Sequence, residues 1–357
     1  MASKKRDIKK AVENHAKEKV EQRRADTKHL IRRDLLRGEA TERELADRFR
    51  LSLTSVRKIL KELRDSGANI VDRDGHLRID RHLAPPSEDQ WKWKGSTRKP
   101  YRCGVVADTH IGSKHFRQDV IDDLYDWFAD EGIDRVYHCG NWIDGERRFN
   151  KHELDDRAHG MEAQIQLFLE CYPQRDGITT YYVAGDDHEG WYSQDTGVDI
   201  GRLLQDRARA FGRTDLVYLG YKEAFITLTN QHGGKCRMLV DHPGGGSSYA
   251  HSYAPQKRIE AAQSGEKPAI WFFGHWHKCG YGFTRGVHWF NVPCGKDLDT
   301  FGRKKGLEYV IGGWMMDIWQ DEQGAVREIV PRVRTYFDRA YHNQQFNLAG
   351  PAAKRRT

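Results

Sequence analysis

Five short apolar runs in this sequence each end in side chains that can bind a metal ion. A lone histidine after a strand is usually a structural residue, but five such ends in succession predict a metal centre. Imidazole together with carboxylate suits manganese, iron or zinc better than magnesium or calcium, which prefer all-oxygen ligands. The five ends are Asp108-Thr109-His110, Gly140-Asn141 through Asp144, Gly185 through Glu189, Asp241-His242 and Gly274-His275-Trp276-His277.

The elements that must position these side chains alternate in type along residues 101–340. Short apolar runs predict strands, and amphipathic spacing predicts helices. Such alternation is typical of a layered α/β domain, in which ligands gather beyond the carboxyl ends of the strands. We expect strands at 101–107, 135–139, 179–184, 236–241 and 269–273, helices near 118–131, 153–170, 198–211 and 253–263, and further strands around 309–311 and 327–330.

The order of these motifs resembles that of the calcineurin-like metallophosphoesterase superfamily. In sequence order they read DxH, G(D/N)xxD, a GN(H)E-like loop, a lone histidine and GHxH, over about residues 101–300. The resemblance implies an α/β fold with a central β-sandwich flanked by helices, rather than the single doubly wound sheet that the alternation alone suggests. It also implies two divalent metal ions, manganese first and iron or zinc as alternatives, that activate a water for attack on a phosphoester.

The resemblance assigns most of the metal-binding side chains to one of two ions. Asp108, His110 and His277 match the ligands of the first metal. His242 and His275 match ligands of the second. We therefore expect two groups of ligands in one site.

Further side chains match positions that the family uses between and around the metals. Position 141, here Asn141, is where the family places an aspartate that touches both ions. His188 matches a histidine that contacts the scissile phosphate and assists the leaving group. Asp144 and Glu189 would orient ligands through hydrogen bonds.

Two departures from the family pattern concern the ligand set. One extra residue separates Gly185 from His188, so the ligand there is Asp186, next to the glycine, or Asp187, next to the histidine; we favour Asp187. Asn141 removes one negative charge from between two dications, which predicts weak metal occupancy and slow turnover. We interpret it as a deliberate inactivating substitution, because the other metal positions are intact, with natural loss or compensation by the extra acid as alternatives.

Residues 27–81 have the pattern of a small helical domain with a hairpin. Leu30, Ile31, Leu35 and Leu36 recur at helical spacing, and Thr41 with Glu44 forms a capping-box pair that opens a second helix. A third helix carries Val56, Ile59, Leu60 and Leu63, and two β-prone runs around Asp74-Gly75 predict a hairpin. This order resembles a winged helix-turn-helix domain, whose third helix enters the DNA major groove.

The basic charge of the chain is concentrated in its first hundred residues. They contain 27 of the 59 Lys and Arg but only 17 of the 52 Asp and Glu, which leaves the remainder slightly acidic. A local basic surplus predicts a polyanionic partner, and duplex DNA fits the domain type. The exposed face of the third helix supplies the candidate DNA-binding residues Arg57, Lys58, Lys61 and Arg64.

The remaining segments are predicted to connect or flank these domains. Residues 1–26 read as a charged helix or arm, 82–100 as a linker that Trp91 and Trp93 pin to its neighbour, and 341–357 as a flexible tail. The sequence contains no apolar run long enough for a membrane span and starts with charge, so we expect a cytoplasmic protein. The six scattered cysteines predict reduced core residues and no zinc site.

These observations favour a dinuclear-metal-dependent phosphodiesterase acting on DNA, as a nuclease or DNA-end-processing enzyme. Two alternatives remain open. In the first alternative, the enzyme acts on a small molecule or a phosphoprotein. In the second, the chain is a DNA-binding regulator with a degenerate esterase domain. Asn141 is the feature that best supports the regulator.

Overall fold

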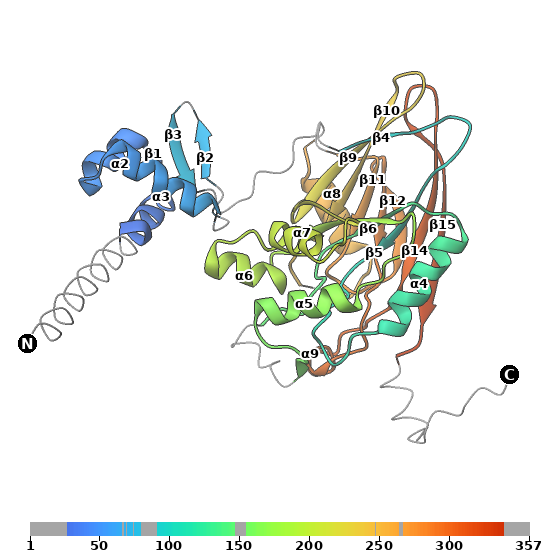
Figure 1. Ribbon diagram of the computed structural model, residues 1–357. Coiled ribbons are helices and arrows are strands. Elements are labelled where there is room, and N and C mark those ends of the chain that lie inside the picture. The colour runs from blue at the N-terminus through green and yellow to red at the C-terminus, as the bar shows by residue number, and fades with distance from the viewer. Residues whose placement is uncertain are drawn as a thin grey trace, which may run out of the picture. The chain divides into compact units, whose positions relative to one another are not determined.

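The computed structural model divides into two compact units, residues 1–83 with 197–199 and residues 84–196 with 200–357 (Figure 1). The residues that it describes are 27–65, 68, 70–73, 75–79, 91–146, 155–246, 248–263 and 267–338. The predicted N-terminal arm over 1–26 and the predicted tail over 341–357 lie outside the described residues.

In its described residues, the N-terminal unit has three helices and a small three-stranded sheet. Residues 27–35 are helical, and the Thr41 side chain and Glu44 form the predicted capping box at the start of the second helix. Ile31, Leu45 and Leu60 are fully buried or nearly so between the helices and the sheet. The remaining elements are β1 (Ala40–Thr41), α2 (Glu42–Phe49), α3 (Leu53–Asp65), β2 (Ile70–Arg73) and β3 (His76–Ile79), with sheet order β1-β3-β2.

The second unit is built on two six-stranded sheets. The first has the order β15-β14-β5-β6-β7-β8 and is parallel from β5 to β8. Its strands are β5 (Tyr101–Val106), β6 (Arg135–His138), β7 (Thr179–Ala184), β8 (Leu216–Tyr221), β14 (Ile311–Gln320) and β15 (Val326–Tyr336).

The second sheet has the order β12-β13-β11-β10-β9-β4. Strands β10, β11 and β13 run parallel to one another. Its strands are β4 (Lys92–Lys94), β9 (Glu223–Thr229), β10 (Lys235–Asp241), β11 (Ile270–Phe273), β12 (Gly280–Thr284) and β13 (Val287–Asn291).

The inner faces of the two sheets pack against each other, and helices cover the outer faces. Because side chains alternate along a strand, Val105 of β5 joins Met238 and Phe272 in the core between the sheets, whereas Val106 faces the helices. The helices are α4 (Gln118–Asp130), α5 (Met161–Cys171), α6 (Glu189–Thr196), α7 (Ile200–Ala210), α8 (Tyr253–Ala261) and α9 (Thr300–Lys305). This β-sandwich flanked by helices is the predicted fold class.

The predicted elements agree with the structure at the strands and less well at one helix. The five apolar runs correspond to β5, β6, β7, β10 and β11. The predicted helix over 153–170 was wrong at its start, since residues 155–160 are not α-helical and α5 begins only at Met161. Gly160 has φ +83°, a conformation that glycine adopts easily, and it turns the chain into the helix.

The predicted linker over 82–100 ends earlier than expected. Residues Lys92–Lys94 form β4, which pairs in parallel with β9 at the edge of the second sheet. Trp93 packs edge-to-face on Tyr181 with ring centroids 5.1 Å apart, and the Arg135 guanidinium lies 4.7 Å from the Trp93 ring. The large aromatic surface is more stable packed than in water, which draws this stretch onto the sandwich.

The structure also bears on the cysteines and on membrane insertion. Four cysteines are buried, and all six are free thiols, with no cysteine in the histidine and aspartate groups described below. Among the described helices, none combines the length and the hydrophobicity that crossing a bilayer requires.

Candidate metal centre

The ends of strands from both sheets meet at one place. Asp108 follows β5, and its backbone N–H donates to the Gly140 carbonyl after β6 at 3.0 Å. Its carboxylate Oδ2 accepts from the backbone N–H of His275, which follows β11 in the other sheet, at 2.8 Å. Asp108 therefore ties the two sheets together where the predicted ligands emerge.

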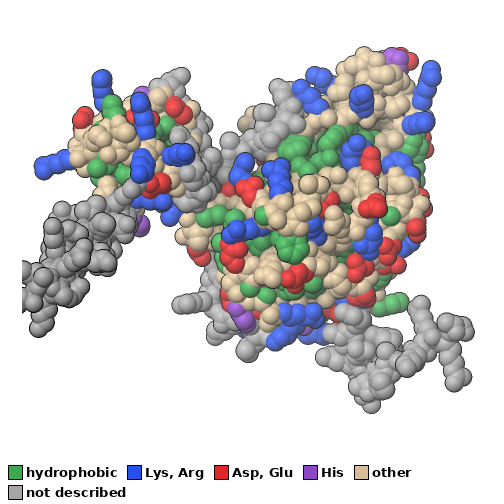
Figure 2. Space-filling model, viewed as in Figure 1, with side chains coloured by type: hydrophobic (Ala, Val, Ile, Leu, Met, Phe, Trp, Pro, Cys, Tyr) green, Lys and Arg blue, Asp and Glu red, His purple; other side chains and the backbone are tan. Residues whose placement is uncertain are grey.

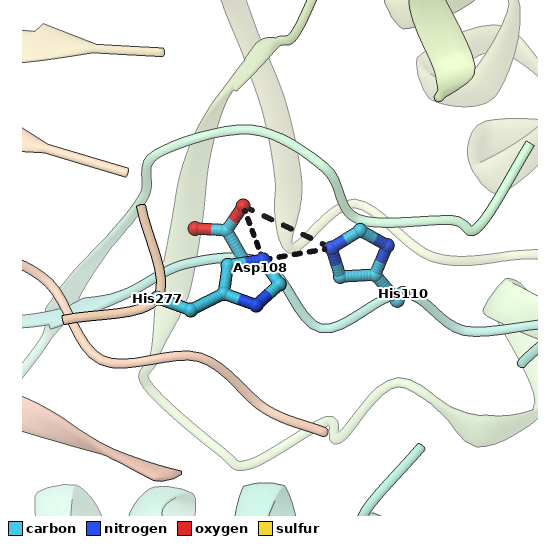
Figure 3. A group of neighbouring side chains, drawn as sticks. All are labelled: Asp108, His110 and His277. Atoms are coloured by element: carbon cyan, nitrogen blue, oxygen red, sulfur yellow. Dashed lines mark hydrogen bonds and ion pairs between the residues drawn. The ribbon is translucent and has the colours of Figure 1, made fainter. Parts of the chain in front are cut away.

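A first group of possible ligands contains Asp108, His110 and His277 (Figure 3). The His277 Nε2 atom lies 3.4 Å from Asp108 Oδ1 and 3.2 Å from His110 Nε2. His110 Nε2 lies 3.9 Å from the same Asp108 oxygen. All three side chains are buried and point toward one another, so they present one oxygen and two nitrogens to a common point.

A second group contains Asp187, His242 and His275. The two Asp187 oxygens lie 3.2 Å from His242 Nε2 and 3.2 Å from His275 Nδ1. The two histidine nitrogens are also 3.2 Å apart. The structure thus brings six of the eight predicted metal-binding residues into two groups of three.

Asn141 lies beside the second group. The Asn141 amide oxygen and the His242 imidazole both lie against Gly185. A Cβ built on this glycine would lie 2.5 Å from Asn141 Oδ1 and 2.9 Å from His242 Cδ2. Asn141 Oδ1 and Asp108 Oδ1 are buried without a hydrogen-bond donor among the described groups. Orphaned acceptors of this kind are costly unless something binds them, and a divalent cation would fit.

Hydrogen bonds to the far ring nitrogens orient three of the histidines. His110 Nδ1 donates to Asp144 Oδ1 at 2.8 Å, and His242 Nδ1 donates to the Cys139 carbonyl at 2.7 Å. His275 uses the opposite nitrogen, since its Nε2 donates to the Gly245 carbonyl at 2.7 Å. In each case the other nitrogen is turned toward the group, where it can bind a metal once it has lost any proton, as metal-binding histidines require.

Glu189 orients the loops rather than a histidine. Its Oε1 accepts from the backbone N–H groups of Asn141 at 2.9 Å and Gly185 at 2.7 Å. The residue is fully buried, and this burial raises the pKa of its carboxyl to about 8. Glu189 therefore fixes Asn141 against the loop after β7, in the supporting role that the resemblance implies.

The backbone at this centre adopts an unusual conformation. Nine non-glycine residues in the described part of the chain have φ between +49° and +74°, and six of them are at this centre. Such values are uncommon outside glycine and persist only where surrounding contacts impose them, often at functional sites. The six are Asp108, His110, Asn141, His188, His275 and His277.

His188 lies at the edge of the first group. Its Nδ1 donates to the Asp144 carbonyl, and its ring stacks on Trp191 with centroids 4.8 Å apart. The His188 ring also meets the His110 ring edge-on at 4.3 Å. The side chain is 22% exposed and lines the cavity over the centre, so its Nε2 is available to a bound molecule.

Asp186 and Asp187 point to different partners. Asp186 Oδ2 pairs with the Lys222 ammonium at 2.6 Å, outside both groups. Asp187 alone contacts His242 and His275.

We expect Asp187→Asn to weaken manganese binding at one site by about tenfold or more, because it removes the only carboxylate of the second group. Asp186→Asn is the matched control and should leave metal affinity unchanged. Titration with manganese, followed by metal analysis after gel filtration, would measure both. Equal loss in the two variants would show that Asp187 is not a specific ligand.

A buried lysine that the sequence did not reveal completes the centre. The Lys296 ammonium lies 2.6 Å from Asp299 Oδ2 and 3.6 Å from Asp144 Oδ1, with its side chain 3% exposed. Burial alone raises the pKa of Asp144, but the charge of Lys296 and the hydrogen bond from His110 lower it well below its ordinary value. Lys296 thereby keeps Asp144 ionised to accept from His110.

The carboxylates of the two groups favour positive charge on two of the histidines. Burial lowers the pKa of His242, but Asp187 and Asp108 raise it to about 10. Burial likewise lowers the pKa of His277, while Cys294 and Asp108 raise it to about 10. Without a metal, both imidazoles are therefore protonated at neutral pH.

Metal binding should therefore release protons, and the apparent affinity for manganese should increase from pH 6 to pH 8. The reason is that the ligands must lose their protons before they coordinate, and the raised pKa values lie above this range. Calorimetric titration in two buffers of different ionisation enthalpy would count the protons. An affinity independent of pH would contradict the assignment of His242 and His277.

The candidate DNA-binding side chains lie on α3 of the N-terminal unit. Lys58 and Lys61 are exposed, and Arg57 is exposed but donates to Glu42 Oε2 at 2.8 Å. The side chain of Arg64 lies outside the described residues. DNA binding by this face remains a prediction.

Comparison with known proteins gives structural neighbours only. No family model matches the chain, and neither does any curated protein sequence. The solved structures that resemble it include a novel archaeal phosphodiesterase (15% identity, TM-score 0.34, covering 66% of this chain and 100% of that chain). A predicted phosphoesterase from Streptococcus pneumoniae has 14% identity and TM-score 0.29, over 68% of this chain and 100% of that chain. GAP50 of the inner membrane complex of Plasmodium has 12% identity and TM-score 0.40, over 67% and 85%. These scores are too low to support a functional inference.

Proposed function

We propose that this chain is a dinuclear-metal-dependent phosphodiesterase that acts on DNA. The observation that carries the proposal is the pair of three-residue groups beside Asn141, formed by motifs whose order resembles that of calcineurin-like metallophosphoesterases. Asp108, His110 and His277 would hold one cation, and Asp187, His242 and His275 the other. When bound, two divalent cations polarise a phosphoryl oxygen and lower the pKa of a water to near neutrality.

The protein side chains around this pair have separate tasks. His188 presents Nε2 to the cavity and would donate a proton to the departing oxygen. Asp144 and Lys296 hold His110 in one tautomer, and Glu189 fixes the Asn141 loop. Trp191 stacks on His188 and lines the cavity beside it.

DNA is proposed as substrate because the N-terminal unit combines a basic helix with a hairpin. Lys58 and Lys61 lie exposed on one helix, in a segment with a surplus of positive charge. A phosphodiesterase for small molecules or phosphoproteins would have no use for this unit. The alternative of a DNA-binding regulator is favoured by Asn141, which leaves the centre one negative charge short of the family pattern.

Lys58→Ala combined with Lys61→Ala should weaken duplex binding and reduce its salt dependence. Each lost phosphate contact lowers the slope of log affinity against log salt by about 0.9, so the double variant should lose about 2. Fluorescence anisotropy from about 50 to 200 mM salt would measure the slope. Lys235→Ala with Lys257→Ala, two exposed lysines of the other unit, serves as the matched control. An unchanged slope would place DNA binding elsewhere.

The deciding experiment uses the Asn141→Asp chain with manganese. Labelled duplex, single-stranded and hairpin DNA are incubated beside bis-p-nitrophenyl phosphate. Cleavage of both DNA and the chromogenic diester supports the proposal. Hydrolysis of the diester alone would eliminate DNA as substrate, and hydrolysis of neither would favour the regulator.

A further inference from the structure

Several aromatic side chains line the cavity over the candidate metal centre. Its volume is about 420 Å³, within the range of about 300–1,000 Å³ typical of small-molecule pockets. Trp191 lies on one side, stacked on His188. Phe301 and Tyr309 line the cavity as well, and the Tyr309 ring lies 4.2 Å from the His277 ring. A flat ring bound here would therefore lie close to the reacting phosphate.

Helix α9 contributes basic and aromatic side chains to the rim of this cavity. Phe301 is 40% exposed, and both Phe301 and Lys305 line the cavity. Arg303, Lys304 and Lys305 are exposed in the last turn of the helix. Figure 2 shows Lys and Arg side chains gathered at the lower edge of this unit, in the region where α9 lies in Figure 1. Positive charge beside an exposed aromatic ring matches a nucleic-acid strand.

A chain of contacts fixes α9 beside the metal ligands. Asp299 caps the helix by accepting from the Gly302 N–H at 2.6 Å, and its other oxygen binds Lys296 at 2.6 Å. Lys296 in turn lies 3.6 Å from Asp144, which accepts from His110. These links are buried, so α9 is held at a constant distance from the first group of ligands.

We infer that the cavity binds one unpaired nucleotide, with its base stacked on Phe301 and a neighbouring phosphate near Lys305. The inference rests on the proposed function and specifies its substrate as a strand whose end is not base-paired. A base inside a duplex is stacked on both faces, whereas an unpaired base can stack on an aromatic ring whatever its sequence.

The test compares the binding of thymidine 5′-monophosphate and methyl phosphate to the full-length chain loaded with manganese. Calorimetry gives both dissociation constants without turnover, so Asn141 does not obscure the result. We expect the nucleotide to bind about tenfold more tightly than methyl phosphate, because stacking adds to the phosphate contact. Phe301→Ala should abolish this preference, and Phe301→Tyr should retain it.

Phe283→Ala is the matched control, because Phe283 is 62% exposed on β12 and does not line the cavity. It should keep the tenfold preference. Equal affinity of the unchanged chain for both phosphates, or a preference that survives Phe301→Ala, would overturn the inference. Failure of the proposed function would instead appear as absence of diester hydrolysis by the Asn141→Asp chain, which is measured separately.

Discussion

Replacing Asn141 by aspartate should raise the manganese-dependent hydrolysis of bis-p-nitrophenyl phosphate by at least about 100-fold, which corresponds to about 2.7 kcal/mol of transition-state stabilisation. The Asn141 side-chain oxygen is buried beside His242 without a hydrogen-bond donor. A carboxylate at this position would add a full negative charge beside the candidate metal ligands, where an amide supplies only a dipole. Steady-state rates with metal content measured on the same samples would test the expectation.

Asn141→Ala is the control for this variant. It removes the orphaned oxygen without adding charge, so it should not increase the rate. The backbone N–H of residue 141 keeps its hydrogen bond to Glu189 in both variants, which preserves the loop. Unchanged activity and unchanged metal content in Asn141→Asp would rule out the idea that the amide limits this centre.

An unchanged rate would instead indicate that Asp187 supplies the negative charge that Asn141 lacks. The family pattern has an aspartate at position 141 and an asparagine near position 187, whereas this chain has the two types exchanged. Asp187 contacts both His242 and His275, so its charge acts within the second group. The double variant Asn141→Asp with Asp187→Asn restores the family arrangement at constant net charge. It would show whether the rate depends on where the negative charge lies or only on how many negative charges the centre has.

The buried strands and their ligands could be predicted from the sequence. Strand β11 is covered on both faces and appears as an unbroken apolar run, and β5 is interrupted only by the half-buried Arg102 and by Gly104. Parallel strands bring their carboxyl ends to one edge, which gathers residues as distant as Asp108 and His277. The resemblance in motif order adds an expected role for each side chain, which periodicity alone does not provide.

Other elements could not be predicted, because their sequences contain neither an apolar run nor a clear periodic pattern. Strand β12 alternates half-buried and exposed residues at a sheet edge and contains two glycines, so it has no apolar run. Helix α6 has almost no amphipathic pattern, because its buried residues Glu189, Gly190 and Trp191 are consecutive instead of spaced along one face. Hydrophobic periodicity arises from side chains that are buried at regular spacing, and these two elements have few of them.

Lys296 shows most clearly where the sequence is insufficient. Lysine is ordinarily exposed, and nothing in its neighbours distinguishes it. Only the fold shows that it is buried between Asp144 and Asp299. The left-handed backbone of the ligand residues is equally invisible in the sequence, since these residues are not glycine.

Replacing His188 by glutamine should slow the cleavage of DNA by the Asn141→Asp chain by about 10²- to 10⁴-fold, the range usual for loss of a general acid. The proton that His188 would donate matters most for a poor leaving group such as a sugar alkoxide. p-Nitrophenolate leaves without protonation, so the hydrolysis of bis-p-nitrophenyl phosphate should fall by less than about tenfold. The two substrates, measured with the same enzyme sample, separate proton transfer from metal binding.

His251→Gln is the matched control, because His251 pairs with Glu308 at 3.0 Å and lies outside both ligand groups. It should leave both rates unchanged. If His188→Gln lowered both rates equally and also reduced metal content, His188 would act by supporting His110, whose ring it contacts at 4.3 Å. A selective loss on DNA would instead assign His188 to the leaving group, because metal support affects good and poor leaving groups alike.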